Sequence, residues 1–425
     1  MFAALLRCAS LWAASLLAVW AWDAPAQLYA AQPAYGADLS AMIAHVRVQH
    51  PDVATAALET DMAAARASAA DSLPDPNFIT EFNNNTWRGS AWSDQSSNRK
   101  YMVEQTFPLG GKRELRRSVA TADRDEADSR RRSIAEDLVL RVKTVQAQRY
   151  ATISSLRLLH DQHALLSRVI DAADRAYAQG RTGQDASLMA RLNLSRHEVE
   201  IVRLEGEQRR LDARLAGLLG QSTVVELAPP LAFAPIPPLD GLNADSLLVL
   251  ARERSPDLAQ QETRIARGEQ QRKLADSEWI PDVSLGARIV EESFQARAYE
   301  GVVSFNIPLR WGLRDAKRSE AVSETSAARM KRSSIELDLI ARLRESLAAL
   351  TAQRRIEALL SSQALPQARA TTDAAMRGLE QGSGQITDVL LAQSRLREIE
   401  MERVKVQAEQ RMTLAEIERA VGGEL

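Results

Sequence analysis

Cysteine is almost absent from this sequence: its 425 residues include only one, Cys8. Cys8 lies in an N-terminal segment in which Arg7 precedes an apolar run from Leu11 to Trp22, and the small residues Ala24-Pro25-Ala26 follow that run. This order is typical of a secretory signal peptide, which we place at residues 1–26. Because cleavage would remove Cys8, we expect a mature chain with neither disulfides nor thiolate metal sites.

Charge of one sign, aromatic side chains and long apolar runs are scarce as well. Lys and Arg number 54 against 56 Asp and Glu, a formal net charge of −2, which argues against a nucleic-acid partner. Aromatic residues make up 5% of the chain, whereas Ala, Leu, Arg, Glu and Gln dominate, a composition typical of long helices. Beyond the N-terminal segment, no stretch reaches the roughly eighteen apolar residues of a membrane-spanning helix.

No motif in the sequence indicates an active site, a cofactor site or a metal site. Nucleophile–base arrangements and phosphate-binding loops do not occur. His160 and His163 are three residues apart and could share a helix face as metal ligands, but no set of carboxylates and cysteines accompanies them. We therefore predict a protein that is not an enzyme and has no cofactor.

The most informative feature that is present is an internal duplication. Four landmarks return in the same order about two hundred residues later, namely Pro51 as Pro256, Pro76 as Pro281, Pro108 as Pro308, and Gly180 as Gly382. Such self-similarity indicates two copies of one supersecondary unit. We place the first repeat at residues 27–227 and the second at 243–425, with a proline-rich linker at 228–242 between them.

Each repeat is predicted to contain a helix, a β-hairpin, a long helix and a return helix about half as long. In the first repeat these are 38–72, a hairpin at 78–107, Lys112 to Ala178, a tip near 180, and Asp185 to Leu219. In the second they are 243–279, a hairpin at 283–307, Gly312 to Arg377 with a kink at Pro366, a tip near 382, and Gln385 to Ala420. The first helix of each repeat has the length to stack end to end with the return helix.

The predicted strands are amphipathic. Tyr101, Val103 and Phe107 share one face, and Met102, Glu104 and Thr106 the other; the strands at 283–289 and 299–307 alternate in the same way. A half-buried soluble sheet would show this pattern too, but the strand lengths are close to those that cross a bilayer at a tilt. Four strands cannot close a barrel, and open edges are not tolerated in lipid, so several copies would have to pool their strands.

Together these features resemble the TolC-like outer-membrane factors. The resemblance covers the mature chain and rests on the duplicated order, on FPLGGKR (107–113) and IPLRWGLR (307–314) after the hairpins, and on YAQG (177–180) and LEQG (379–382) at the tips. It implies a mainly α fold with a small β part: a homotrimer whose 12-stranded β-barrel spans the outer membrane and continues as a long α-helical tunnel in the periplasm. The segment FPLGGKRELRR after LPDPNF is most similar to the heavy-metal (cobalt–zinc–cadmium and copper–silver) efflux branch.

The resemblance also implies a function and partners. Such proteins are passive exit channels of tripartite efflux systems, and they contact outer-membrane lipid, a periplasmic adaptor protein and an inner-membrane pump, here of the RND type. Heavy-metal cations are the cargo that the branch suggests. The alternatives are the same channel in drug efflux or type I protein secretion, and a structural or adhesive coiled-coil protein of the envelope.

Two candidate sites follow from the same resemblance. Asp388 is expected to form a charged ring at the periplasmic entrance, although the second aspartate of such a ring is Leu391 here, and Asp185 lies in the corresponding place of the first repeat. Alternatively, Asp388 only stabilises the helix dipole. The tip residues are expected to contact the adaptor, or their glycines only close the helical hairpins; these residues are Gly180, Arg181, Thr182, Gly183, Gly382, Ser383 and Gly384.

Overall fold

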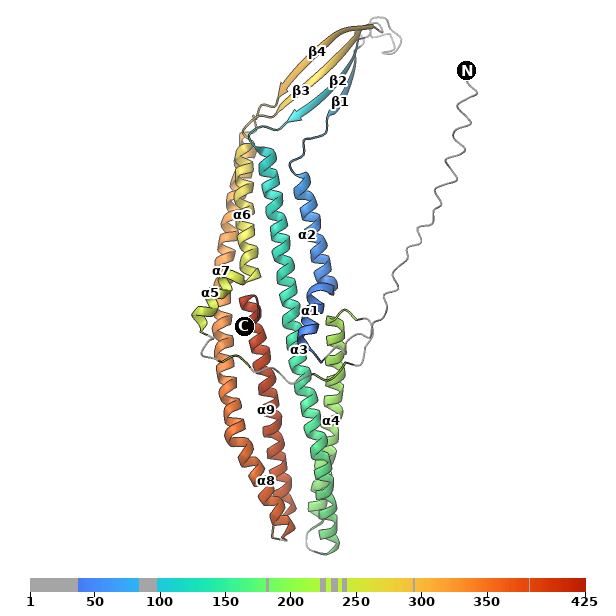
Figure 1. The fold of residues 1–425 in the computed structure, drawn as a ribbon, viewed down its shortest axis with the longest axis vertical. Helices are drawn as coiled ribbons and strands as arrows, with labels where there is room; N and C mark the ends of the chain where they lie inside the picture. Colours follow the sequence, from blue (N-terminus) through green and yellow to red (C-terminus); the bar gives the residue numbers. More distant parts are fainter. Residues whose placement is uncertain are drawn as a thin grey trace, which may run out of the picture.

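The structure is a computed structural model that describes residues 37–83, 98–180, 183–221, 227–230, 236–238, 243–292, 295–381 and 383–425. The described part is elongated, with a sheet at one end and helices running to the other (Figure 1). The expected signal peptide at 1–26, most of the linker, and the tip residues Arg181, Thr182 and Gly382 lie outside the described residues.

The first repeat contains helices and strands in the predicted order. They are α1 (Leu39–Gln49), α2 (Pro51–Ala69), β1 (Asn77–Asn83), β2 (Asn98–Phe107), α3 (Lys112–Ala178) and α4 (Gln184–Leu218). The predicted bounds of α3 are confirmed, because no proline or glycine interrupts the helix over 67 residues. α1 and α2 are separate helices because Pro51 has no N–H to continue α1 and instead occupies the first turn of α2.

The second repeat follows the same plan, but it departs from the prediction at Pro256, and near Pro366, where a kink was predicted, it contains a π-helical segment. Its elements are α5 (Ala244–Arg254), α6 (Pro256–Ser277), β3 (Val283–Glu292), β4 (Gln295–Phe305), α7 (Trp311–Leu359), the π-helical segment η2 (Leu360–Ala364), α8 (Leu365–Glu380) and α9 (Ile386–Val421). The expected helix 243–279 is interrupted at Ser255, before Pro256. Near Pro366 the expected single helix contains a π-helical turn, which accommodates a proline ring that would clash with the preceding α-helical turn.

The strands form one antiparallel sheet in the order β1-β2-β3-β4. The central pairing joins the two repeats, with Val103 of β2 opposite Ala287 of β3. Consequently, β1 and β4 are the two open edges of the sheet. The register confirms the predicted alternation of faces, since Tyr101 pairs with Ile289 and Ile289 pairs with Tyr299.

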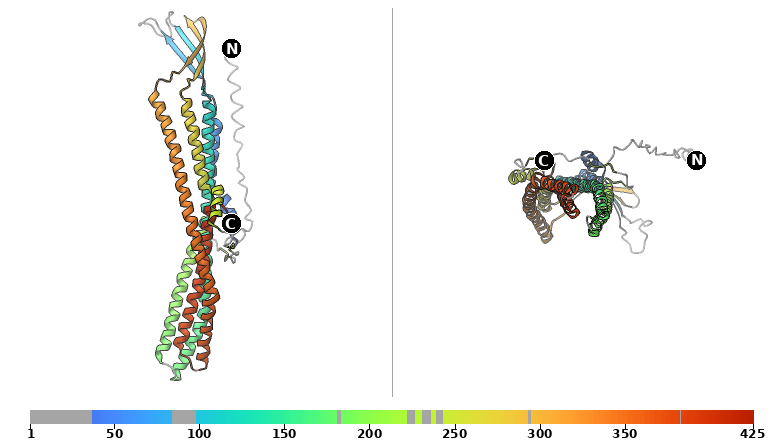
Figure 2. Two further views of the ribbon diagram at one scale, coloured as in Figure 1. Left: turned by 90° about the vertical axis from the view of Figure 1, so that its left-hand side faces the viewer. Right: turned by 90° about the horizontal axis from the view of Figure 1, so that it is seen from below.

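The helices form a curved wall that continues from the sheet (Figure 2). Near the sheet, α3 packs between α2 and α6, and α6 packs against α7. Toward the far end, α3 packs between α4 and α9, and α9 packs against α7 and α8. The wall therefore ends in α2 and α4 on the side of the first repeat, and in α7 and α8 on the side of the second.

The half-length helices stack end to end as predicted. The end of α4 meets the junction of α1 and α2, where Leu215 and Leu219 share a core with Met42, Val46 and Val53. The end of α9 meets the junction of α5 and α6 in the same manner, with a core that contains Leu247, Ala251, Leu258, Leu339, Leu343, Leu350, Ile417 and Val421.

A glycine ends each of the two return helices. Gly220 follows α4 with a φ of 71°, and Gly422 follows α9 with a φ of 87°. Glycine adopts this left-handed conformation without the strain that a Cβ would cause. At Gly422 the space is also limited, because an added Cβ would press against the carbonyl group of Arg254. The close approach of α9 to the end of α5 therefore depends on this glycine.

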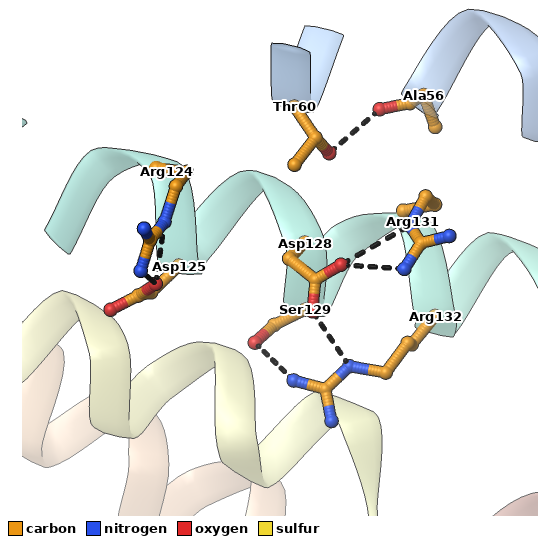
Figure 3. Close-up of polar contacts among 8 residues, drawn as sticks. All are labelled: Ala56, Thr60, Arg124, Asp125, Asp128, Ser129, Arg131 and Arg132. Carbon is orange, nitrogen blue, oxygen red and sulfur yellow. Dashed lines mark hydrogen bonds and ion pairs between the residues drawn. The ribbon is translucent and has the colours of Figure 1, made fainter. Parts of the chain in front are cut away.

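The long helix α3 carries local ion pairs along its surface (Figure 3). Asp128 accepts from Arg131 at 2.7 Å and lies 3.3 Å from Arg132, at the three- and four-residue spacings that place side chains next to each other on a helix. Exposed helical pairs of this kind contribute about 0.3–0.5 kcal/mol each. Their small contributions help to stabilise a helix whose surface is polar over much of its length.

Two arginines hold the start of the linker and Pro237 within it against the wall. Arg149 of α3 is fully buried and donates to the carbonyl oxygens of Leu227 and Ala228, each at 2.8 Å. Arg354 of α7 donates to the carbonyl oxygen of Pro237. The two arginines are equivalent in the duplication, because both end an Ala-Gln-Arg triplet, at 147–149 and at 352–354.

Candidate functional site

One face of the sheet is apolar and exposed. Its side chains come from all four strands, and Tyr299 is 82% exposed. The large apolar members of this face are Phe78, Phe82, Val103, Leu285, Ile289, Tyr299, Val303 and Phe305. A continuous exposed apolar face of this kind marks a surface that is covered by lipid or by another protein.

The opposite face of the sheet is polar and is held together by cross-strand contacts. Lys100 lies 3.7 Å from Glu81, and Arg288 lies 3.3 Å from Glu300. Ser304 donates to Glu104 at 2.8 Å. The sheet therefore has one mainly apolar face and one that carries its charged pairs, although Ile79, Met102, Val290 and Val302 also lie on the second face.

The segment FPLGGKR forms a structural corner between β2 and α3. Lys112 is buried, and its Nζ donates to Asp282 at 2.7 Å and to the carbonyl oxygen of Ile280 at 2.6 Å. Both acceptors belong to the second repeat, so the corner also ties the repeats together. Gly110, at a φ of 71°, packs so closely on Ile280 that a Cβ would lie 2.5 Å from its Cδ1 atom.

The two helical hairpins end together at the end of the wall that is far from the sheet (Figure 1). A shared core contains Leu166 and Val169 of α3, Ala190 of α4, and Ile386 and Val389 of α9. The cores of the two repeats therefore merge at the tips, so that the turns of both hairpins face the same direction.

The described tip residues show how glycine closes the second hairpin. The backbone N–H groups of Ser383 and Gly384 both donate to the carbonyl oxygen of Gly378, at 3.0 and 2.9 Å. A Cβ on Gly384 would lie 2.8 Å from the carbonyl carbon of Gly378, so the turn has no space for a side chain there. In the first hairpin, Gly180 has a φ of 68°. Contact of these tips with an adaptor stays a prediction.

Asp388 and Asp185 occupy the first turns of α9 and α4, and both are exposed. Neither carboxylate forms an ion pair with any other described residue. Asp388 lies on a groove between α8 and α9 that is lined mainly by small side chains, with Leu391 and Arg395 on the α9 side. The geometry leaves both carboxylates free to act on a solvated path, and equally free to stabilise the helix N-termini.

A polar cluster that the sequence did not indicate lies between the helices near the tips. His197 of α4 is 6% exposed, and its Nε2 contacts the guanidinium group of Arg397 on α9. Burial, Arg397 and His163 lower the pKa of His197 to about 4. Glu400 of α9 accepts from Arg369 of α8 at 3.1 Å. No sequence motif could have identified this cluster, because its members are far apart in the chain.

The described residues include neither a candidate metal-binding group nor a candidate membrane-spanning helix. They contain no group of three or more His, Cys, Asp and Glu side chains placed to hold a metal ion. Within the same residues, no helix has the length and apolar character to cross a bilayer.

Comparisons with known proteins identify the family. The family model described as "Outer membrane efflux protein" matches residues 42–221 and 247–423, one match for each repeat. No curated protein sequence matches the chain. The matches to solved structures, in contrast, extend over nearly the whole chain.

Three solved structures illustrate the likeness. A membrane protein from Pseudomonas aeruginosa is 17% identical, with 92% of each chain covered and a TM-score of 0.78. The outer membrane protein VceC of Vibrio cholerae is 17% identical, with 91% of this chain and 96% of that chain covered and a TM-score of 0.75. CusC, whose structures describe transmembrane channel formation, is 15% identical, with 91% and 92% covered and a TM-score of 0.76. At these identities the likeness establishes the fold.

The duplicated fold, the two-faced sheet and the two family matches all indicate the same family. Proteins of this family are TolC-like channels of the Gram-negative outer membrane and not enzymes, and they function as trimers in tripartite efflux systems. The chain belongs to the outer membrane efflux protein family.

Proposed function

We propose that three copies of this chain form the exit channel of a tripartite efflux system, with the sheets in the outer membrane and the helices in the periplasm. The observation that carries the proposal concerns the sheet and both levels of the helical wall. Each of them has one open edge on the side of the first repeat and one on the side of the second. The first repeat supplies β1, α2 and α4 at one edge, and the second supplies β4, α7 and α8 at the other. Joining opposite edges head to tail generates a closed ring when the rotation from one copy to the next closes, as it would for three copies of a curved wall.

Exposed apolar side chains on these edges support the closure. Met62 of α2 is 52% exposed, and Met330 of α7 is 70% exposed. Other large apolar side chains lie exposed on the same edge helices, namely Leu58 on α2, Leu188, Leu192, Val199 and Val202 on α4, and Val322 and Leu337 on α7. Their burial between copies would remove apolar surface from water, which stabilises association.

The duplication also predicts complementary charges where the edge of one copy meets the edge of the next. Inside the chain, Arg264 of α6 pairs with Glu126 of α3 at 2.6 Å. Equivalent residues of the two repeats differ by 205 along these helices, as do the prolines that begin α2 and α6 and the two Ala-Gln-Arg triplets on α3 and α7. The pair therefore corresponds to Glu59 (264 − 205) and Lys331 (126 + 205). The charges are reversed but still complementary. Lys331 is exposed and has no ion pair within the described residues, so it is free to pair with Glu59 of the next copy.

A cross-linking experiment tests the closure. The pair Arg267–Asp123, at 2.6 Å, corresponds by the same offset to Met62 (267 − 205) and Ala328 (123 + 205). Because the mature chain is expected to lack cysteine, Met62→Cys with Ala328→Cys introduces the only thiols. A short bis-maleimide should then link copies to the mass of a trimer and no higher. The double variant Met62→Cys with Met189→Cys, whose second site lies near the tips, should give monomers. Monomers from both variants would contradict the proposal.

The polar face of the sheet would line the channel, and the apolar face would contact lipid. We infer that cargo moves through it passively, under work done by an RND-type pump through a periplasmic adaptor. Heavy-metal cations are the proposed cargo, because the corner segment resembles that branch of the family. A disruption strain should lose tolerance to zinc or copper. Unchanged metal tolerance with new sensitivity to antibiotics or bile salts would instead assign the channel to drug efflux.

We further propose that Asp388 lines the periplasmic entrance and that the hairpin tips contact the adaptor. Exposure of the carboxylate, its place near the tips and the absence of an ion pair in the described residues support this role. In planar bilayers, Asp388→Asn should lower cation selectivity, whereas Asp185→Asn should change it less. If Asp388 only stabilises its helix, both variants should lower stability slightly and leave selectivity unchanged.

A further inference from the structure

A small cavity lies inside the bundle that α3, α4, α8 and α9 form near the tips. Its volume is about 40 Å³, and its polar lining includes Gln162 of α3, Asn193 and His197 of α4, and Gln393, Ser394 and Arg397 of α9. One water molecule needs roughly 10–15 Å³ of such space. The cavity therefore has room for a few water molecules or for one small ion.

The charge beside this cavity is positive and has no counter-ion in the described part of the chain. Arg397 contacts the ring of His197 and donates to the hydroxyl oxygen of Ser394 at 3.2 Å, but it forms no ion pair with a carboxylate of the described residues. The nearby carboxylate on its own helix, Glu400, instead accepts from Arg369 and, at 3.4 Å, from Gln162. Arg397 is half-buried, so its charge is only partly in contact with water. A partly desolvated charge without a counter-ion is still costly, so a bound anion would stabilise the site.

The hydrogen-bonding groups at the cavity also favour a negatively charged ligand. Arginine can only donate, so His197 Nε2 must accept from Arg397, and the proton of the neutral ring is then on Nδ1. That Nδ1 atom is buried and has no partner among the described residues. The side-chain nitrogen of Gln393, also a donor, is likewise buried and unpartnered within the same part of the chain. Residues with two orphan donors and a guanidinium group thus line one cavity.

A cation would not fit this arrangement. The groups that lower the pKa of His197, beyond its burial, are Arg397 and His163, and no carboxylate of the described residues opposes them. A metal ion would meet a guanidinium charge and an N–H group rather than a lone pair. Water is the competing occupant: it could satisfy the orphan donors, but unlike an anion it would not neutralise the half-buried guanidinium charge.

We propose that this cavity is a binding site for a small inorganic anion, for which chloride has a suitable size. The anion would accept from His197 Nδ1 and from Gln393, and would neutralise Arg397. Because the lining comes from both repeats, the anion would join the α3–α4 hairpin to the α8–α9 hairpin just above the tips. The site is independent of the cargo and would be occupied whether or not the channel conducts.

Anomalous scattering from bromide tests the proposal directly. Crystals of the full chain, purified in detergent and grown with bromide in place of chloride, should show one bromide per chain within hydrogen-bond distance of Arg397. Arg397→Met should abolish this peak. The matched control is Arg395→Met, since Arg395 lies two residues away and pairs at the surface with Glu398 at 3.1 Å. A cavity without bromide in the wild type would overturn the proposal.

A second measurement does not depend on crystals or on the folding of the arginine variant. Thermal unfolding is followed in chloride and in gluconate at equal ionic strength, since gluconate is too large for the cavity. Chloride should raise the melting temperature of the wild type and of Arg395→Met, with saturation. Gln393→Met keeps the size of the side chain but loses one donor, and its half-saturation should be about tenfold weaker. Equal melting temperatures of the wild type in the two salts would refute the site.

Discussion

Arg149 offers the sharpest test of how this chain holds the start of the linker against the first repeat. Its side chain is fully buried between α3 and α4, where Nε donates to Asp212 at 2.5 Å. Its remaining nitrogens donate to the carbonyl oxygens of Leu227 and Ala228 at the start of the linker, each at 2.8 Å. Arg149→Met keeps an unbranched side chain of similar length but removes the charge and the donors. The substitution therefore isolates the polar contacts from the packing.

The magnitude follows from what the substitution leaves behind. Removal of one partner from a buried ion pair costs about 3–5 kcal/mol, and each buried carbonyl without a donor adds about 1–3 kcal/mol. Two factors reduce the sum, because the side chain of Asp212 is 17% exposed and the linker can move into water. We therefore expect a loss near the lower limit, about 3 kcal/mol of unfolding free energy. That is a large part of the roughly 5–15 kcal/mol that stabilises a typical protein.

Two assays measure the effect. Urea unfolding at neutral pH gives the loss of stability, and Asp212→Leu in the Arg149→Met background should recover part of it, since an apolar pair replaces the buried charge. Thermolysin, which cuts before apolar residues, should cleave the linker at Leu231, Phe233 or Leu239 faster in Arg149→Met than in the wild type.

The control for Arg149 is an exposed ion pair on α4. Arg210 pairs with Glu207 at 2.5 Å, and its side chain is 60% exposed. Arg210→Met should cost less than about 1 kcal/mol. If Arg149→Met also costs less than this and its linker is cleaved no faster than that of the wild type, the arginine does not hold the linker, and the reasoning fails.

Three further predictions concern other parts of the wall. Lys112→Met should lower the unfolding free energy by about 3 kcal/mol, because it leaves Asp282 without its buried partner; partial recovery in Lys112→Met/Asp282→Asn would identify the ion pair as the cause. Gly384→Val should speed amide exchange at the second tip, because the turn lacks space for a Cβ there. As a control, Gly206→Ala should stabilise α4 by up to about 1 kcal/mol, because no described atom lies within 4 Å of the added Cβ. Finally, the lowered pKa of His197 implies stability that is complete above pH 6.5 and is lost as the pH falls toward 4, because the unfolded chain takes up the proton first. With about 1.4 kcal/mol per pKa unit, the loss is at most about 3.5 kcal/mol per chain. Urea unfolding of wild type and His197→Asn at about pH 7 and about pH 4.5 should reveal it as a larger decrease in the wild type.

The sequence predicted best where one strong local signal decided the structure. The uninterrupted stretch from Lys112 to Ala178 became a single helix, and the alternation around Tyr101 fixed which side chains share a face of the sheet. At Pro366 the sequence predicted a disturbance but not its form. A proline removes one backbone hydrogen bond, and whether the helix bends, breaks or widens into a π-turn depends on what packs around it.

The polar contacts inside the wall could not be predicted in the same way. Arg149 lies on α3, 63 residues before Asp212, and a lone arginine on a long polar helix is usually solvated. His197 and Arg397 belong to different repeats and meet only because the tips merge. One signal was nevertheless present, since the triplet Ala-Gln-Arg occurs at the same place in both repeats. A charged residue that both repeats carry at the same place on a helix is a candidate for a buried contact.

The repeats would meet at two kinds of contact, α3 with α6 within the chain and α7 with α2 between copies. The reversed charges at these two contacts explain why first and second repeats would alternate around the ring. Within the chain, Glu126 of α3 meets Arg264 of α6, and between copies Lys331 of α7 would meet Glu59 of α2. If a first repeat were followed by another first repeat, Glu126 would face Glu59, and in the corresponding arrangement of second repeats Lys331 would face Arg264. Both arrangements place like charges together, which costs free energy and disfavours the wrong neighbour. The duplication therefore supplies a common wall, and the differences between its halves fix the order in which they join.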